Sequence, residues 1–370
     1  MDETQIPAHT RFEFVEANGQ RFRVASLGEG ERLALCLHGF PECWYSWRFQ
    51  MPLLARLGYR VWAPDLRGYG ESSRPLRIED YAIEQLMDDV AGLIDASGAK
   101  STLLIAHDWG GIIAWWFAMR KLRPLERLVA MNIPHMAAAR EAAGWRQRRR
   151  SWYALFFQLP GLPERMFGRD ARRIGRMFLR TAAHPEAFRP EDIEVYRRNA
   201  ARPGALTAMI HYYRALVRGG GMRRQLALGS PLIEVPTLLL WGTEDIALGV
   251  ELTHGTERYV KDLTLRYLPG VGHWVQQEAP DDVNALLEAW LTGRPVPQLP
   301  GSERYAPQAG AAGAQRGGSP KGRPQAYPRR EAERSRISGP PGAPATFAPS
   351  RRASPRRHCP GPERRSCGPA

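Results

Sequence analysis

Short apolar runs recur along the chain and alternate with longer amphipathic stretches. Each run has four to six residues, a length that suits a strand buried on both faces better than a helix. The runs lie at residues 33–37, 60–63, 103–106, 127–132, 237–241 and 265–268. Before them, residues 11–27 predict two strands joined at Asn18–Gly19, a dipeptide typical of tight hairpin turns. The pattern predicts an α/β fold with a mostly parallel central sheet flanked by helices.

The strand pattern is interrupted between residues 136 and 230. This stretch predicts mainly helices, and it is rich in arginine and aromatic residues. A helical insertion in an α/β chain usually covers the carboxyl edge of the sheet, where such folds bind ligands. We therefore expect a core made of residues 1–135 and 231–293, with a helical cap at residues 136–230.

Residues 294–370 have a different composition. They contain 15 Lys and Arg, 4 Asp and Glu and 25 Pro and Gly, but only six large apolar residues. Such a segment cannot bury enough apolar surface to offset the entropy of ordering it, so we expect a disordered basic tail. The tail supplies most of the net charge of +14. Its arginine pairs could contact phosphates, but it lacks stacking aromatics and an amphipathic face, so we expect no nucleic-acid partner and a solvated extension.

The amino terminus and the cysteines bear on location. Residues 1–5 are polar and acidic, unlike a secretory signal, and no apolar run approaches the ~20 residues of a membrane-spanning helix. Cys36 and Cys43 precede the cap, and Cys359 and Cys367 lie in the tail. This arrangement is neither a disulfide framework nor a zinc pattern. We expect a cytoplasmic protein without a membrane span.

One segment passes from an apolar run into a helical pattern through a very tight turn. It covers residues 103–112, with Asp108 among the small residues Ala106, Gly110 and Gly111. Only small neighbours let a sharp strand-to-helix turn push one side chain out above the sheet, as in a nucleophile elbow. Taken alone, Asp108 is equally well interpreted as a helix N-cap.

Three further features favour a catalytic role for Asp108. The sequence His38-Gly39-Phe40-Pro41 follows the first central strand, where backbone N–H groups can form an oxyanion hole. Asp245 follows the strand at residues 237–241, and His273 follows the strand at residues 265–268. The order nucleophile, acid, histidine is that of the α/β-hydrolase fold.

The sequence from His38 to Trp290 resembles the epoxide hydrolase branch of the α/β-hydrolase family. The resemblance is densest at residues 39–42 (GFPE), 68–75 (GYGESSRP) and 107–111 (HDWGG). Within the cap, residues 152–158 are similar to the family segment that carries a first ring-opening tyrosine, here Tyr153. Residues 211–214 are similar to the segment with the second, here Tyr213. The family commonly has Asn at the first position of that segment, where this chain has His211.

The resemblance implies hydrolysis of an epoxide to a vicinal diol. Asp108 would attack a ring carbon and form an ester, while Tyr153 and Tyr213 assist the leaving oxygen. His273, oriented by Asp245, would then activate water to cleave the ester. No metal or cofactor is needed. The expected partners are a small hydrophobic epoxide and water, in a monomer or homodimer that serves detoxification.

The resemblance also implies contacts around the reacting groups. The oxyanion hole would consist of the backbone N–H groups of Phe40 and Trp109. The residues expected to bind substrate are His38, Pro41, Trp109, Phe157 and Trp274.

Several alternatives remain open. A haloalkane dehalogenase shares the Asp nucleophile, but such enzymes often place Asn, a halide donor, where Phe40 stands. A fluoroacetate-type dehalogenase would have Arg in place of Trp109, and an esterase or lipase would have Ser at position 108. An inactive relative acting as a receptor for a hydrophobic ligand is also compatible with the residues. The arginines at 146 and 148–150 are interpreted as a solvated helix face rather than a phosphate site.

Overall fold

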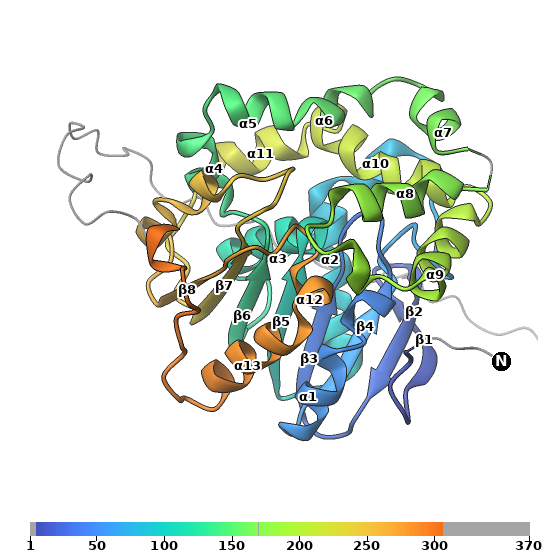
Figure 1. Cartoon of the computed structure of the whole chain (residues 1–370). Helices are drawn as coiled ribbons and strands as arrows, with labels where there is room; N and C mark the ends of the chain where they lie inside the picture. The colour runs from blue at the N-terminus through green and yellow to red at the C-terminus, as the bar shows by residue number, and fades with distance from the viewer. Residues whose placement is uncertain (1–4, 169, 306–370) are drawn as a thin grey trace, which may run out of the picture. The chain divides into compact units, whose positions relative to one another are not determined.

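The computed structural model describes residues 5–168 and 170–305. An eight-stranded sheet lies at the centre, with helices on both faces and further helices above one of its edges (Figure 1). This architecture confirms the mostly parallel α/β sheet predicted from the apolar runs and the α/β-hydrolase fold implied by the family resemblance. The expected disorder of residues 306–370 concerns positions outside the described residues.

The strands follow the order β1-β2-β4-β3-β5-β6-β7-β8. β1 pairs antiparallel with β2, and β2 with β4, whereas all later neighbours are parallel. Asn18 and Gly19, which join β1 to β2, both have positive φ, as the predicted hairpin turn requires. The strands are β1 (Arg11–Ala17), β2 (Gln20–Leu27), β3 (Arg32–Leu37), β4 (Arg60–Pro64), β5 (Ser101–His107), β6 (Arg127–Met131), β7 (Thr237–Gly242) and β8 (Leu263–Leu268).

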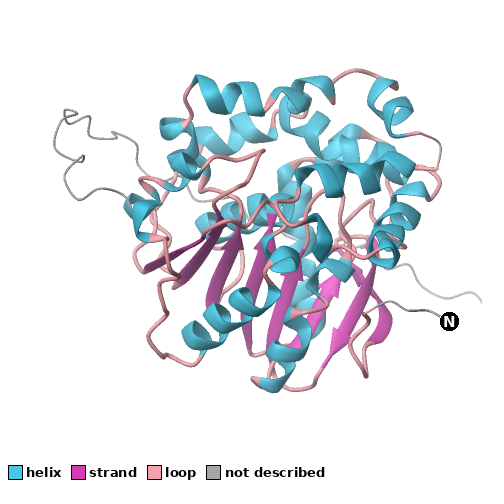
Figure 2. Cartoon of the chain, viewed as in Figure 1, coloured by secondary structure: helices cyan, strands magenta, loops and turns pink. Residues whose placement is uncertain are grey.

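The central strands are buried on both faces. Every residue of β7 is buried, as is every residue of β5 after its first. Helices cover the two faces of the sheet (Figure 2). α2 and α3 lie on one face and α1 and α13 on the other (Figure 1). These flanking helices are α1 (Gln50–Arg56), α2 (Ile83–Ser97), α3 (Asp108–Arg120), α12 (Val275–Glu278) and α13 (Pro280–Leu291).

The chain between β6 and β7 forms the helices above the sheet edge (Figure 1). They are α4 (Met136–Ala142), α5 (Trp145–Arg150), α6 (Trp152–Phe156), α7 (Leu162–Phe167), α8 (Arg172–Thr181), α9 (Pro190–Ala201), α10 (Ala205–Arg218) and α11 (Gly221–Ala227). We call these helices the cap. Apart from residue 169, the stretch in which the sequence predicted helices contains no strand. The division into core and cap domains stays a prediction.

The first residues of the predicted tail pack against the core. The guanidinium of Arg266 in β8 donates hydrogen bonds to the carbonyl oxygens of Val296 and Pro297. The ring of Tyr305 lies 5.9 Å from that of Tyr267. The tail boundary predicted at residue 294 is therefore wrong for residues 294–305, because backbone carbonyls bind a core arginine. Among the described residues, no helix combines the length and apolarity needed to cross a membrane.

Candidate active site

Asp108 is the first residue of α3 and directly follows the carboxyl end of β5. Its φ of 48° lies in the left-handed region, which is uncommon for a residue other than glycine. The tight turn depends on a glycine at position 110, where a Cβ would lie only 2.2 Å from the carbonyl oxygen of Leu37. This strained turn raises the carboxylate above the sheet edge, as the elbow interpretation predicts.

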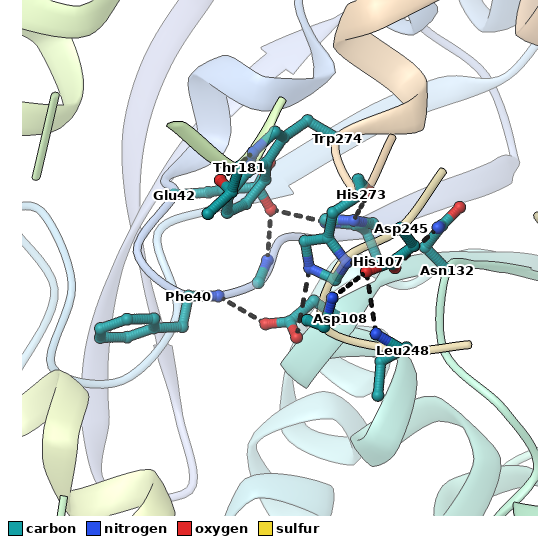
Figure 3. A network of polar contacts seen from close by, with 12 residues as sticks. Phe40, Glu42, His107, Asp108, Asn132, Thr181, Asp245, Leu248, His273 and Trp274 are labelled. Atoms are coloured by element: carbon teal, nitrogen blue, oxygen red, sulfur yellow. Dashed lines mark hydrogen bonds and ion pairs between the residues drawn. The ribbon is translucent and has the colours of Figure 1, made fainter. Parts of the chain in front are cut away.

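The Asp108 carboxylate contacts the loop after β3. The Phe40 N–H donates a hydrogen bond of 2.7 Å to Asp108 Oδ1 (Figure 3). Gly39 lies so close that an added Cβ would be 2.4 Å from Asp108 Cβ. Glycine at position 39 therefore lets the β3 loop bring an N–H group against the carboxylate.

His273 lies between two carboxylates (Figure 3). Its Nδ1 donates to Asp245 Oδ2 at 2.6 Å, and its Nε2 is 3.7 Å from Asp108 Oδ2. Asp245 Oδ2 also accepts from the Asn132 amide at 2.9 Å. Asp245 Oδ1 accepts from the backbone N–H groups of Ala247 and Leu248. Asp245 is thus fixed by four donors and in turn fixes the imidazole ring.

Burial and mutual charge act in opposite directions on these groups. Burial raises the pKa of Asp108, but the hydrogen bond and charge of His273 more than offset this, so the pKa lies below its usual value. Burial also raises the pKa of Asp245, but the charge and hydrogen bond of His273, together with the hydrogen bonds from Asn132 and Leu248, outweigh it, so this pKa is likewise lowered. For His273, burial lowers the pKa, yet the two carboxylates raise it well above 6.5. Asp108 is therefore ionised at neutral pH.

A buried network supports both sides of this arrangement. Glu42 Oε2 accepts from the Gly39 N–H and from His107 Nδ1, both at 2.8 Å. Glu42 Oε1 accepts from the side-chain amides of Gln276 and Gln277. His107 Nε2 donates in turn to the carbonyl oxygen of His273 at 2.9 Å (Figure 3). One carboxylate thereby joins the β3 loop to the histidine loop.

Glu42 and His107 lie within the motifs GFPE and HDWGG, but no role was predicted for either side chain. Their positions beside Phe40 and Asp108 in the sequence could have indicated a supporting role, because hydrogen-bonded side chains next to reacting groups fix the geometry of those groups. Asn132 was missed as well. It follows the carboxyl end of β6, where the parallel pairing with β7 brings it beside Asp245.

Two cap tyrosines face the carboxylate. Tyr153 lies in α6 and Tyr213 in α10, and their ring centroids are 6.0 Å apart. Burial raises the pKa of both phenols, and the negative charge of Asp108 raises it further. The Tyr213 ring also contacts Phe40 and Trp109 at centroid distances of 5.3 and 4.9 Å. Both phenols therefore stay protonated near neutral pH.

These groups line a cavity of 1160 Å³ between sheet and cap. Its wall includes Asp108, His273 and both tyrosines, together with Phe40, Phe157 and Trp274. The Trp274 Nε1–H donates to Thr181 Oγ1 of α8 at 3.0 Å, which joins the histidine loop to the cap. The structure thus brings together residues that the sequence places more than 160 positions apart.

Three predicted substrate contacts fall outside the cavity wall. His38 is fully buried, with Nδ1 donating to the Gly39 carbonyl and Nε2 accepting from the Leu66 N–H. Pro41 is buried, and the Trp109 ring packs against that of Tyr213. The assignment of His38, Pro41 and the Trp109 side chain to substrate binding is therefore corrected. His38 instead holds two loops together.

Comparison with known proteins places this site in a family. Residues 35–280 match the family described as alpha/beta hydrolase fold. Epoxide hydrolase 4 of Mus musculus is 38% identical over 286 residues, which cover 75% of this chain and 78% of that protein. The chain belongs to the epoxide hydrolase branch of the alpha/beta hydrolase family. The "AB hydrolase superfamily protein YfhM" of Bacillus subtilis is also 38% identical, over 75% of this chain and 97% of that protein.

Solved structures of epoxide hydrolases share the same fold. The crystal structure of epoxide hydrolase A from Mycobacterium thermoresistibile aligns with a TM-score of 0.68 and 31% identity, covering 78% of this chain and all of that one. An epoxide hydrolase from an endophytic Streptomyces aligns with a TM-score of 0.69 and 27% identity, over 78% of this chain and 96% of that one. The chain therefore has the fold of its family, and the family match at residues 35–280 includes every residue of the candidate site.

Proposed function

We propose that this member of the epoxide hydrolase family converts an epoxide and water to a vicinal diol through an ester on Asp108. The observation that carries the proposal is the pairing of an ionised carboxylate on the cavity wall with two protonated phenols on the cap. A carboxylate attacks an sp³ carbon without needing a base. An epoxide oxygen leaves only with help, which phenol O–H donors supply.

The first half-reaction opens the ring. One oxygen of Asp108 forms a bond to a ring carbon as that carbon's bond to the epoxide oxygen breaks. The electron pair goes to the epoxide oxygen, which accepts hydrogen bonds from Tyr153 and Tyr213 and takes a proton from one of them. The apolar walls supplied by Phe40 and Phe157 exclude water, which strengthens these hydrogen bonds.

The second half-reaction cleaves the ester. The Nε2 of His273 takes a proton from water as the water oxygen attacks the ester carbonyl carbon. Asp245 holds the ring with Nδ1 protonated, which leaves Nε2 as the base. The N–H of Phe40, which already contacts Asp108 Oδ1, and that of Trp109 in the first turn of α3 would stabilise the oxyanion. Collapse breaks the ester C–O bond, and His273 gives its proton to the departing alkoxide to release the diol. The second proton of the water passes from the carboxyl group to the phenolate, which restores the tyrosine and the Asp108 carboxylate.

A single turnover in heavy-oxygen water with excess enzyme tests this route. The attacking water oxygen ends on the carboxylate, so label should appear in the peptide that contains Asp108, and the released diol should be unlabelled. The Asp108→Ala variant should fold and show no turnover. Label found directly in the diol would contradict a covalent route.

A second measurement compares substrates. Matched epoxide and haloalkane substrates, assayed for diol and for halide, distinguish the proposed activity from that of a dehalogenase. Halide release without epoxide turnover would overturn the proposal. The cytoplasmic location, the role in detoxification and the monomeric or dimeric state stay predictions.

A further inference from the structure

Six arginines line the cavity that contains Asp108. Three lie on α5 and three on α8, and both helices belong to the cap above the sheet (Figure 1). On α8 the spacings are three and four residues, and on α5 the first arginine precedes the other two by three and four residues, so each set lies on one face of its helix. The six are Arg146, Arg149, Arg150, Arg173, Arg176 and Arg180. We call them the arginine cluster.

The cluster is poorly neutralised. Within the described part of the chain, the only ion pair that involves it joins Arg150 to Glu251 at 4.0 Å. Arg173 donates to the carbonyl oxygen of Met166, which carries no charge. Among the described residues that line the cavity, Asp108 is the only acidic one. Most of the positive charge thus faces the cavity without a carboxylate beside it.

Burial separates the cavity into two parts. Phe40, Phe157, Phe167, Tyr213 and Trp274 are all at most 8% exposed and surround the reacting groups. All members of the arginine cluster are exposed. The cavity therefore has an apolar interior and a cationic mouth. The arginines at 146 and 148–150 are all exposed, as a solvated helix face requires, and those at 146, 149 and 150 also line the cavity.

The side chains at the mouth suit an anionic group. The guanidinium groups of Arg146 and Arg149 lie 5.8 and 5.5 Å from the ring of Trp145, a cation–π contact that restrains them. A guanidinium presents N–H donors in a planar fork that matches the oxygens of a carboxylate or phosphate. A neutral epoxide has no group that would use six such donors.

The cavity is also larger than a small epoxide requires. Its 1160 Å³ slightly exceeds the roughly 300–1,000 Å³ of pockets for drug-sized ligands. We propose that the preferred substrates are epoxides on an apolar chain whose far end carries an anionic oxygen group, which the arginine cluster binds. This proposal rests on the proposed epoxide hydrolysis and names its substrate class. The epoxide would lie beneath Tyr153 and Tyr213, with the chain along the aromatic wall.

The test uses matched substrates of one chain length. Two pairs are compared: an epoxide ending in a carboxylate with its methyl ester, and an epoxide ending in a phosphate monoester with the free alcohol. We expect KM to be lower for the anionic member, with kcat similar within a pair. Whichever pair shows the larger difference identifies the carboxylate or the phosphate as the preferred group. Added salt should raise KM for the anionic member alone, because exposed charges are screened.

Two double variants distinguish binding by the arginine cluster from a general effect of the positive charge of the cap. Arg149→Gln combined with Arg176→Gln removes two cavity arginines. Arg148→Gln combined with Arg172→Gln removes the same charge from the same helices at exposed positions that do not line the cavity. The first variant should raise KM for the anionic substrate about tenfold and leave the neutral substrate unchanged. The control variant should change neither.

Direct binding distinguishes failure here from failure of the proposed function. The saturated carboxylate without an epoxide is titrated by calorimetry into the parent enzyme and both variants. Binding that is lost only in the cavity variant supports the arginine cluster even if no epoxide is hydrolysed. The proposal would be overturned by equal KM values within both substrate pairs. It would also be overturned if both variants lost binding of the saturated carboxylate to the same extent. A third contrary outcome is a cavity variant that keeps the parent KM for the anionic substrate but no longer binds anionic phospholipid vesicles. The arginine cluster would then be a membrane-binding surface and not a substrate site.

Discussion

Asp245→Asn is the substitution for which the hydrogen bonds around the site give the sharpest expectation. The Asn carbonyl oxygen must stay where Asp245 Oδ1 accepts two backbone N–H groups. The new NH₂ group then replaces Oδ2 and faces His273 Nδ1, which is 2.6 Å away, and the Asn132 amide, which is 2.9 Å away. Asn132 cannot turn over freely, because its Oδ1 accepts from the Gly242 N–H at 2.8 Å.

The size of the effect follows from these contacts. To avoid two facing donors, His273 must accept at Nδ1 and carry its proton on Nε2, so it cannot take a proton from water. The same tautomer change in a Ser-His-Asp triad slows kcat about 10⁴-fold, which corresponds to about 5 kcal/mol of activation free energy. The unmatched Asn132 donor should lower the free energy of unfolding by about 1–3 kcal/mol. Ring opening by Asp108 needs neither Asp245 nor His273, so ester formation should proceed in this variant.

The assay is intact-protein mass spectrometry after rapid mixing with epoxide. We expect the variant to gain the mass of one substrate molecule and to lose it about 10⁴-fold more slowly than the parent. Glu244→Gln, at the exposed neighbouring position, is the matched control and should turn over normally. Diol release near the parent rate would refute the role of Asp245, and slow turnover without an ester would refute the covalent route.

Three further predictions concern other groups of the site. Tyr213→Phe and Tyr153→Phe should each lower the rate of ester formation, about 100-fold or more, in stopped-flow assays, whereas decay of preformed ester should change little. Glu42→Gln breaks a buried pair and should lower the free energy of unfolding by about 3 kcal/mol in denaturant titrations. His273 has a raised pKa in the folded enzyme, so its stabilisation is fully present below pH ~6.5 and is lost as pH rises through the folded value. The Tm should fall over that window in the parent and less in His273→Gln; equal slopes would contradict this.

Much of the fold was predictable because its signals are local. Short apolar runs bounded by turn residues predicted every strand of the sheet within a few residues, and Asn18–Gly19 predicted the hairpin. The turn at Asp108 could be recognised because it needs small neighbours at fixed spacing. The order of Asp108, Asp245 and His273 then predicted which strand ends meet at one edge.

Properties that depend on packing could not be predicted in this way. His38 follows a strand as a ligand-binding residue would, yet its side chain turns away from the cavity and bonds the Leu66 N–H. The residues of the arginine cluster look like ordinary exposed helix positions, because only the folded cap shows that α5 and α8 face one cavity. Residues 294–305 have a tail-like composition, but their backbone binds Arg266, and backbone contacts leave no trace in composition.

The charge of Asp108 links the two half-reactions. In the free enzyme this charge helps Asp245 to hold the pKa of His273 high, so the imidazole is charged and cannot act as a base. Ester formation removes the charge of Asp108, so the pKa of His273 must fall towards the value set by Asp245 and burial. We therefore expect ester decay, followed in single turnover against pH, to slow below a midpoint lower than that of the stability change in the free enzyme. Coincident midpoints would show that Asp108 does not control the histidine.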